Sequence, residues 1–217
     1  MLVLCLEGAH GAGKSSFIDY LEKQGYSVLD EAFLDQPEYG LHPQTLTMEF
    51  NWVSNWLMRL LRVCHELPVE LDKKTIFVAD RSPYSAELYS RKNGHLLKPV
   101  IDAQIAELFE SARIKVLTVH ITCDSQTLWN RIQDRLRLEP ERKRYGEHRH
   151  EWMTQAKEFY DNHGWDHTID NSNKTFVQMK DELVSIVKNT FNDYPIPGEN
   201  YFSPLKVSLP TRKVYTL

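Results

Sequence analysis

Short apolar runs alternate along the chain with longer segments in which apolar residues recur every three or four positions. Five apolar runs predict strands, at residues 1–7 (MLVLCLE), 26–32 (YSVLDEA), 75–80 (TIFVAD), 114–122 (IKVLTVHIT) and 166–170 (DHTID). The first run is apolar at almost every position, which is typical of a strand with both faces buried in a parallel sheet.

The segments between these runs have the spacing of helices. They cover residues 13–25, 45–67, 82–91, 98–112, 125–136, 151–162 and 176–191. The segment 45–67 is apolar on nearly all sides, so we expect much of it to be buried. Strands and helices alternate throughout, which predicts an α/β fold with a parallel sheet.

The pattern changes near the C-terminus. Residues 193–217 carry Pro195, Pro197, Pro204 and Pro210 and show no clean helical period. We therefore expect one domain at residues 1–192, followed by a proline-containing tail at 193–217. Three interpretations of the tail stay open: an extended arm, a disordered end, or a segment that binds a partner.

Composition and charge narrow the class of protein. The chain has 217 residues, 41% of them apolar and 26% charged, as expected of a globular domain. Its formal net charge of −4 argues against a general attraction to nucleic acid or membranes, so an anionic ligand must be held by a local arrangement. The apolar start is too short for a signal segment, and no stretch approaches the length of a membrane span.

Three cysteines, Cys5, Cys64 and Cys123, lie far apart and lack the spacing of metal ligands. Two of them lie within apolar runs, where a cysteine usually packs as a small buried residue. Lone thiols without a disulfide framework favour a reducing compartment, so we expect a cytoplasmic protein.

The first predicted strand runs directly into EGAHGAGKSS, residues 7–16. Gly8, Gly13, Lys14 and Ser15 fit the pattern G-x-x-x-x-G-K-[ST] between a buried strand and a helix. Glycines let successive backbone N–H groups point into one concavity, and the helix start adds partial positive charge. The pattern therefore predicts a binding loop for the phosphates of ATP. The residues expected to contact them are Gly8, Ala9, His10, Gly11, Ala12, Gly13, Lys14, Ser15 and Ser16.

Four side chains complete this predicted phosphate site. Lys14 is expected to reach the β- and γ-phosphates, and the hydroxyl of Ser15 to bind Mg²⁺. The run TIFVAD ends in Asp80, whose carboxylate is expected to hold the same ion at the edge of the sheet. Arg81 follows, and a guanidinium there can bind phosphate through two parallel hydrogen bonds. Taken without the glycine loop, Asp80 and Arg81 also fit a surface ion pair at a strand end.

A basic stretch begins in the predicted helix 125–136. Arg131 and Arg135 are four residues apart and share one helix face. With Arg137 they are the leading candidates to contact the transferring phosphoryl group, from a lid at about residues 136–150. Glutamates alternate with the arginines there, so a solvated, self-paired surface segment is the competing interpretation.

These motifs together resemble the thymidylate kinase and deoxynucleoside kinase superfamily over about residues 1–190. The segment DRSPYS is similar to the E-R-S-x-Y-S of cellular deoxynucleoside kinases, with Asp80 in place of glutamate. It is also similar to the D-R-H-P of herpesviral thymidine kinases, whose glycine loop carries a histidine like His10, and to the D-R-[YFH]-x-x-S of thymidylate kinases. The resemblance implies a three-layer αβα fold with a parallel five-stranded sheet and an arginine-rich lid. It also implies transfer of phosphate from ATP to a nucleoside or a nucleoside monophosphate, by an enzyme that can form a homodimer.

In this superfamily the acceptor binds between the long helix after the second strand and the DRS segment. The resemblance therefore implies a substrate site formed by Phe50, Asn51, Asn55, Arg59, Arg81 and Tyr84. An aromatic ring there would stack on a nucleobase, and an amide would bond its edge. The aromatic residues of this helix also fit a face that packs in the core.

Glu31, at the end of the second predicted strand, bears on the nature of the acceptor. A hydroxyl acceptor needs a base, and the resemblance to deoxynucleoside kinases gives that role to the glutamate at this place. Thymidylate kinases usually have an arginine nearby for the acceptor's phosphate, which Asp30, Glu31 and Asp35 would repel. We therefore expect a deoxynucleoside kinase, with a thymidylate kinase and, less favoured, a nucleotide-binding regulator as alternatives. Its expected catalytic residues are Glu31, Arg81, Lys14, Arg131, Arg135 and Arg137.

Overall fold

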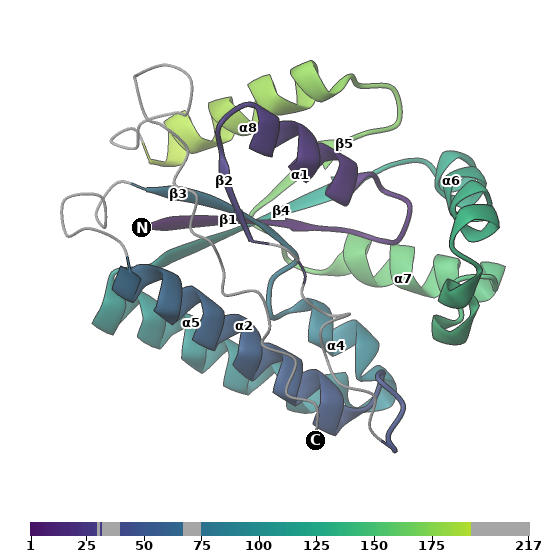
Figure 1. Ribbon diagram of the computed structural model, residues 1–217, viewed down its shortest axis with the longest axis horizontal. Helices are drawn as coiled ribbons and strands as arrows, with labels where there is room; N and C mark the ends of the chain where they lie inside the picture. Colours follow the sequence, from purple (N-terminus) through teal and green to yellow (C-terminus); the bar gives the residue numbers. More distant parts are fainter. Residues whose placement is uncertain (30, 32–39, 67–74, 192–217) are drawn as a thin grey trace, which may run out of the picture.

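The computed structural model describes residues 1–29, 31, 40–66 and 75–191. Within these residues five strands form one parallel sheet in the order β2-β3-β1-β4-β5 (Figure 1). The strands are β1 (Leu2–Glu7), β2 (Ser27–Leu29), β3 (Ile76–Asp80), β4 (Lys115–Thr122) and β5 (His167–Asp170). The predicted parallel five-stranded sheet is confirmed.

Helices cover both faces of this sheet. They are α1 (Lys14–Lys23), α2 (Leu46–Glu66), α4 (Ser85–Tyr89), α5 (Lys98–Ala112), α6 (Ser125–Leu138), α7 (His150–Asn162) and α8 (Phe176–Thr190), with 3₁₀ helices η1 (Arg91–Leu96) and η2 (Pro140–Tyr145). Helices α1 and α8 lie on one face and α2 and α5 on the other (Figure 1). This is the expected three-layer αβα arrangement.

The central strand β1 shows why helices are needed on both faces. All six of its residues are buried. Leu2, Leu4 and Leu6 belong to the core cluster shared with α1 and α8, whereas Val3 and Cys5 belong to the cluster shared with α2 and α5. A strand buried in this way has a continuous apolar sequence, as the run LVLCL does.

The position of β1 in the sheet brings two motifs together. It lies between β3 and β4, with Leu6 opposite Asp80 and Glu7 opposite His120. Because the strands are parallel, the segments that follow β1 and β3 leave the sheet at the same edge. Open parallel sheets bind ligands at this carboxyl edge, where the strand order reverses.

The long helix α2 meets the sequence expectation only in part. Trp52 and Trp56 are buried, but Phe50, Met58 and Leu61 are exposed to 44%, 56% and 40%. Much of the helix is buried, as expected, but one side is exposed. One face packs on the sheet, and no described element covers the opposite face.

Smaller differences occur at element ends. The predicted helix at 82–91 is divided into the short α4 and the 3₁₀ helix η1. The expected lid at 136–150 holds the end of α6, then η2 and the turn before α7. The predicted tail at 193–217 lies outside the described residues. Within the described part of the chain, no helix has both the length and the apolar character needed to cross a membrane.

Candidate active site

The glycine loop between β1 and α1 has a backbone that requires glycine. Gly8, Gly11 and Gly13 have φ angles of 143°, 82° and 93°, a region that other residues rarely adopt. A Cβ on Gly8 would lie 2.3 Å from the carbonyl oxygen of Ile121 on β4. The strand therefore approaches the loop so closely that no side chain fits there.

Lys14 lies over this loop rather than in solvent. Its side chain is buried, and Nζ donates hydrogen bonds to the carbonyl oxygens of Gly8 at 2.7 Å and Ala9 at 3.0 Å. Burial and the nearby Arg81 lower the pKa of Lys14 to about 8. A polyanion in the loop would restore the charged form, because an opposite charge favours it.

Ser15 and Asp80 form the second part of the site. Ser15 Oγ donates to Asp80 Oδ2 at 2.9 Å, so the two residues meet although 65 positions separate them. Asp80 Oδ1 is buried and has no hydrogen-bond partner within the described residues. A free carboxylate oxygen beside a hydroxyl fits Mg²⁺, which keeps several waters and binds one or two protein oxygens together with substrate phosphates. Among the described residues, no cluster of three or more His, Cys, Asp or Glu could hold a metal ion.

Arg81 and Glu31 meet at the first glycine of the loop. Arg81 is 2% exposed, and its Nη1 lies 3.3 Å from the carbonyl oxygen of Gly8. Its Nε forms an ion pair with Glu31 Oε1 at 2.8 Å. The backbone of Glu31 is held by Trp52 of α2, whose indole N–H donates to its carbonyl oxygen at 3.0 Å. The structure thus brings the expected base and the expected phosphate-binding arginine together.

His10 links the loop to the segment before α7. Its Nε2 lies 3.0 Å from the hydroxyl of Tyr89, and its Nδ1 lies 3.4 Å from Glu147 Oε1. Burial, with the charges of Arg81 and Lys14, holds the pKa of His10 well below its usual range. The lowered pKa favours neutral His10 at neutral pH, and its two ring nitrogens connect the loop to Tyr89 and Glu147.

The three candidate arginines of the lid have different surroundings. Arg131 donates from Nη2 to the carbonyl oxygen of Asn171 at 3.3 Å, and its Nη1 lies beside the position that a Cβ on Gly13 would take. Its Nη1 is buried and has no hydrogen-bond partner within the described chain. Arg135 pairs with Glu139, just past the end of α6, at 3.4 Å, and Arg137 pairs with Asp134 on the same helix at 2.9 Å. Of the three, the structure places Arg131 next to the phosphate-binding loop.

The residues of α2 that were expected to bind the acceptor lie mostly on its exposed side. Phe50, Asn51 and Asn55 are exposed, and Arg59 is half-buried. The face of α2 that meets the site carries Trp52, Trp56 and Glu49, a carboxyl that is 1% exposed. Burial and the neighbouring Glu31 raise the pKa of Glu49.

Tyr84, the remaining expected acceptor residue, turns toward α5. Its hydroxyl donates to Asp102 Oδ1 at 2.9 Å. Its ring also lies near the ammonium of Lys98 and the ring of His163. These contacts hold Tyr84 against α5 and the end of α7.

The sequence matches a known protein family. A sequence model of the AAA domain family matches residues 4–154, more than half of the chain. The chain belongs to the AAA domain family. A search of curated protein sequences finds no match to this AAA domain.

Solved structures show which fold this AAA domain shares. Thymidylate kinase from Candida albicans superposes with a TM-score of 0.58 at 17% identity, over 88% of this chain and 92% of that one. Deoxyadenosine kinase from M. mycoides, solved with the products dCMP and dCDP, gives a TM-score of 0.52 at 17% identity, over 87% of this chain and 99% of that one. The same kinase with bound dATP gives a TM-score of 0.52 at 15% identity, over 86% and 99% of the two chains. The AAA domain thus has the fold of these P-loop kinases, as its motifs predicted.

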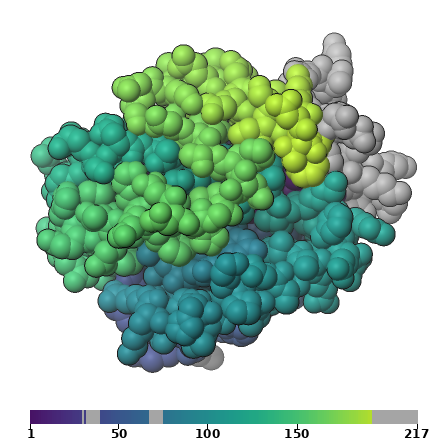
Figure 2. Space-filling model, turned by 180° about the vertical axis from the view of Figure 1, so that it is seen from behind, coloured from purple at the N-terminus to yellow at the C-terminus, as the bar shows by residue number. Residues whose placement is uncertain are grey.

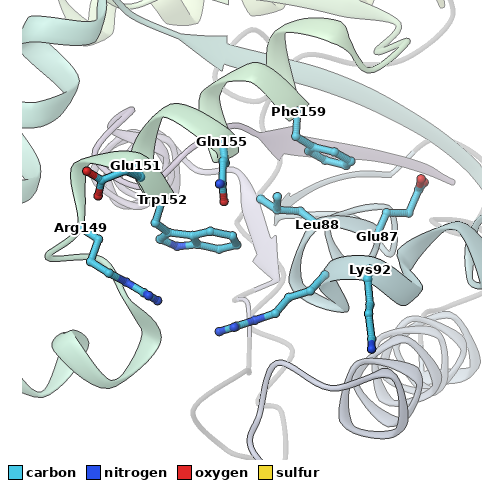
Figure 3. Close-up of a pocket in the computed structure, with 9 residues that line it drawn as sticks. Glu87, Leu88, Lys92, Arg149, Glu151, Trp152, Gln155 and Phe159 are labelled. Atoms are coloured by element: carbon cyan, nitrogen blue, oxygen red, sulfur yellow. The ribbon is translucent and has the colours of Figure 1, made fainter.

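A cavity of about 600 Å³ lies between α4, η1 and α7. In Figure 3, Trp152, Gln155 and Phe159 point into it from α7, while the carboxylate of Glu151 points away from the indole ring. None of its described lining residues comes from α2, where the sequence placed the acceptor. From behind, the surface of α7 and the teal surface of the α4–α5 region border one another (Figure 2).

Several residues of the site were missed by sequence reasoning. Asn171, after β5, is buried, and its Nδ2 donates to the carbonyl oxygen of Ala12 in the loop at 2.7 Å. Glu7, Ser85 and Tyr160 surround Arg81 and its neighbour Ser82. Ser85 is the last residue of the DRSPYS motif and so had a signal in the sequence. Glu7 had a local signal, because a carboxylate ends a strand that is otherwise wholly apolar. Tyr160 and Asn171 are too distant in sequence to have shown one.

Proposed function

We propose that this AAA domain transfers the γ-phosphoryl group of ATP to the 5′-hydroxyl of a deoxynucleoside. The observation that carries the proposal is the Glu31 carboxylate, 2.8 Å from the guanidinium of Arg81 at the mouth of the glycine loop. A carboxylate at that point can take the proton of an attacking hydroxyl. It would repel an acceptor that is already an anion.

The step can be written with the chain's own residues. Backbone N–H groups of the loop and Lys14 bind the β- and γ-phosphates, and Arg81 stabilises charge on the transferring group. The acceptor oxygen forms a bond to the γ-phosphorus while its proton passes to Glu31. The bond between the γ-phosphorus and the bridging oxygen breaks, and ADP leaves with that electron pair. Mg²⁺, held by Ser15 and Asp80, would neutralise charge on the phosphates.

A deoxynucleoside monophosphate is the alternative acceptor. The chemistry would be the same, but Arg81 would hold the acceptor's phosphate instead of Glu31 receiving a proton. The buried guanidinium beside Gly8 is the observation that supports this alternative.

One panel distinguishes the two acceptors. ADP release is measured with ATP and Mg²⁺ against thymidine, deoxycytidine, deoxyadenosine, deoxyguanosine and their 5′-monophosphates. Turnover with a nucleoside supports the proposal, and turnover with monophosphates alone replaces it by the thymidylate kinase type. ATP binding with slow hydrolysis that no acceptor accelerates would instead indicate a nucleotide-binding regulator.

The variant Glu31→Gln tests the role of the base. It keeps the shape of the side chain but removes its basicity, so we expect kcat to fall by about 10²-fold or more, with nucleoside KM changed by less than about threefold. Glu22→Gln, an exposed carboxylate on α1, is the matched control and should behave as wild type. Near-normal turnover by Glu31→Gln would remove the base assignment.

A further inference from the structure

Arg81 has a backbone conformation that its surroundings must maintain. Its φ angle is 70°, in the left-handed region that non-glycine residues adopt only at a cost. Its N–H donates to the carbonyl oxygen of Leu6 at 3.1 Å, and its own carbonyl accepts from the indole N–H of Trp56 at 3.2 Å. Strand β1 and helix α2 thus hold the peptide on each side of this residue.

The guanidinium is held separately from the backbone. Nη1 donates to the hydroxyl of Tyr160 on α7 at 2.5 Å and lies 3.3 Å from Ser85 Oγ on α4. The Arg81 guanidinium carbon also lies 5.1 Å from the ring centre of Tyr89 and 5.9 Å from that of Tyr160, within the range of cation–π attraction. Helix α4, which follows β3 closely, and helix α7, which comes much later in the chain, therefore both position the Arg81 guanidinium.

Glu7 connects these contacts to the central strand. Its Oε1 accepts from the N–H of Ser82 at 2.6 Å and from Ser82 Oγ at 2.5 Å, and its Oε2 accepts from Ser85 Oγ at 2.7 Å. Ser85 Oγ in turn lies 2.9 Å from the hydroxyl of Tyr160. A continuous chain of hydrogen bonds thus runs from β1 through α4 to α7 and ends on Arg81.

Glu7 and Tyr160 cannot act by touching a ligand at this site. Both have 0% exposure, and Ser85 has 1%. Burying a carboxylate among three donors is costly unless every bond is made, so this network fixes the geometry of the groups attached to it. Arg81 is the attached group that lies against the phosphate-binding loop, through its contact with Gly8.

We propose that Glu7 and Tyr160 are positioning residues, which set the direction of the Arg81 guanidinium toward the transferring phosphoryl group. This inference rests on the proposed function, since it assigns Arg81 a place in that reaction. A displacement of about 1 Å at a group of this kind is enough to lower a rate strongly.

A double-mutant cycle tests the inference. Tyr160→Phe removes only the hydroxyl and keeps the ring, so kcat should fall by about tenfold while KM for ATP and for the acceptor changes less than about twofold. In the Arg81→Lys background, the same change should lower kcat by less than about twofold, because the hydroxyl has lost the group it positions. Full additivity of the two losses would overturn the proposal.

Glu7→Gln gives the second arm. It removes the negative charge, keeps one acceptor oxygen for Ser82 and turns an amide NH₂ toward Ser85, so its effect on kcat should also be lost in the Arg81→Lys background. Tyr20→Phe on α1 is the control for removal of a tyrosine hydroxyl and should retain wild-type kcat. Thermal midpoints of all variants are measured alongside. A fall in kcat that is independent of Arg81 would show that the network only supports the fold.

The failure of this inference is distinguishable from failure of the proposed function. If the acceptor panel finds no substrate, the same cycle is measured on the dissociation constant of ADP with Mg²⁺ and aluminium fluoride, which mimics the transferring phosphoryl group. Coupling between Tyr160→Phe and Arg81→Lys would then still support positioning at the phosphate site. Independent effects, or none, would overturn it.

Discussion

At the scale of single residues, Lys14 gives the clearest pH dependence. Its pKa is lowered to about 8 by burial and by Arg81, and a bound triphosphate should raise it again. Below pH 8 Lys14 is already protonated in the free protein. Above pH 8, ATP binding must be accompanied by uptake of a proton by Lys14. We expect the dissociation constant for ATP to rise by up to about tenfold per pH unit above pH 8.

Calorimetric titration of ATP between pH 6.5 and 9.5 measures this effect. Lys14→Arg is the control, because a guanidinium stays charged across that range. Its ATP affinity should be lower overall but flat with pH. A wild-type affinity that is equally flat would contradict the role given to burial.

At the scale of elements, the close contact between the glycine loop and β4 determines which residue can occupy position 8. A Cβ on Gly8 would lie 2.3 Å from the backbone oxygen of Ile121, and the φ angle of 143° is itself unfavourable for other residues. Strand β4 is held by its pairing with β1 and β5, so the loop would have to move to admit a Cβ. We expect Gly8→Ala to weaken ATP binding by at least about tenfold and to destabilise the fold by about 2 kcal/mol.

Gly164→Ala is the matched control for this change. An added Cβ there would meet no atom within 4 Å, so affinity and stability should stay at wild-type values. ATP titration and urea unfolding measure both quantities. Wild-type ATP affinity in Gly8→Ala would mean that the loop does not hold the phosphates in this conformation.

At the scale of the whole molecule, His120 links stability to pH. It is buried beside the rings of Tyr160 and Trp165, and burial lowers its pKa to about 4. The unfolded chain therefore binds a proton between about pH 6.5 and 4 that the folded protein does not. Stability contributed by neutral His120 is complete above pH 6.5 and is lost as the pH falls toward 4, with a loss of about 2 kcal/mol at pH 5.

Urea unfolding at pH 7.5 and pH 5 measures this loss. Asp161 and Lys157 also lie near the His120 ring, and their effects on its pKa oppose each other. Comparing wild type with His120→Gln isolates the imidazole, because other titrating groups are common to both proteins. The variant should lose less stability between the two pH values, whereas His148→Gln, an exposed histidine, should match wild type. If His120→Gln and His148→Gln lost the same stability between pH 7.5 and pH 5, the link between stability and the His120 pKa would be contradicted.

The sequence by itself determined the parts of this protein that depend on neighbours along the chain. The apolar run of β1 needs burial on both faces, and the alternation with helical segments leads to a parallel sheet. The loop at residues 8–15 can be recognised because its glycines, Lys14 and Ser15 have fixed spacing. Asp80 and Arg81 could be placed beside it because parallel strands end at one edge.

Only the tertiary structure decided which distant side chains complete the site. Tyr160 meets Arg81 across 79 positions, and Asn171 meets Ala12 across 159. It also decided that α2 turns Glu49 inward and leaves Phe50 exposed. The physical reason is that such contacts arise from how helices pack on the sheet. That packing depends on the shapes of many side chains at once and leaves no pattern in any one segment.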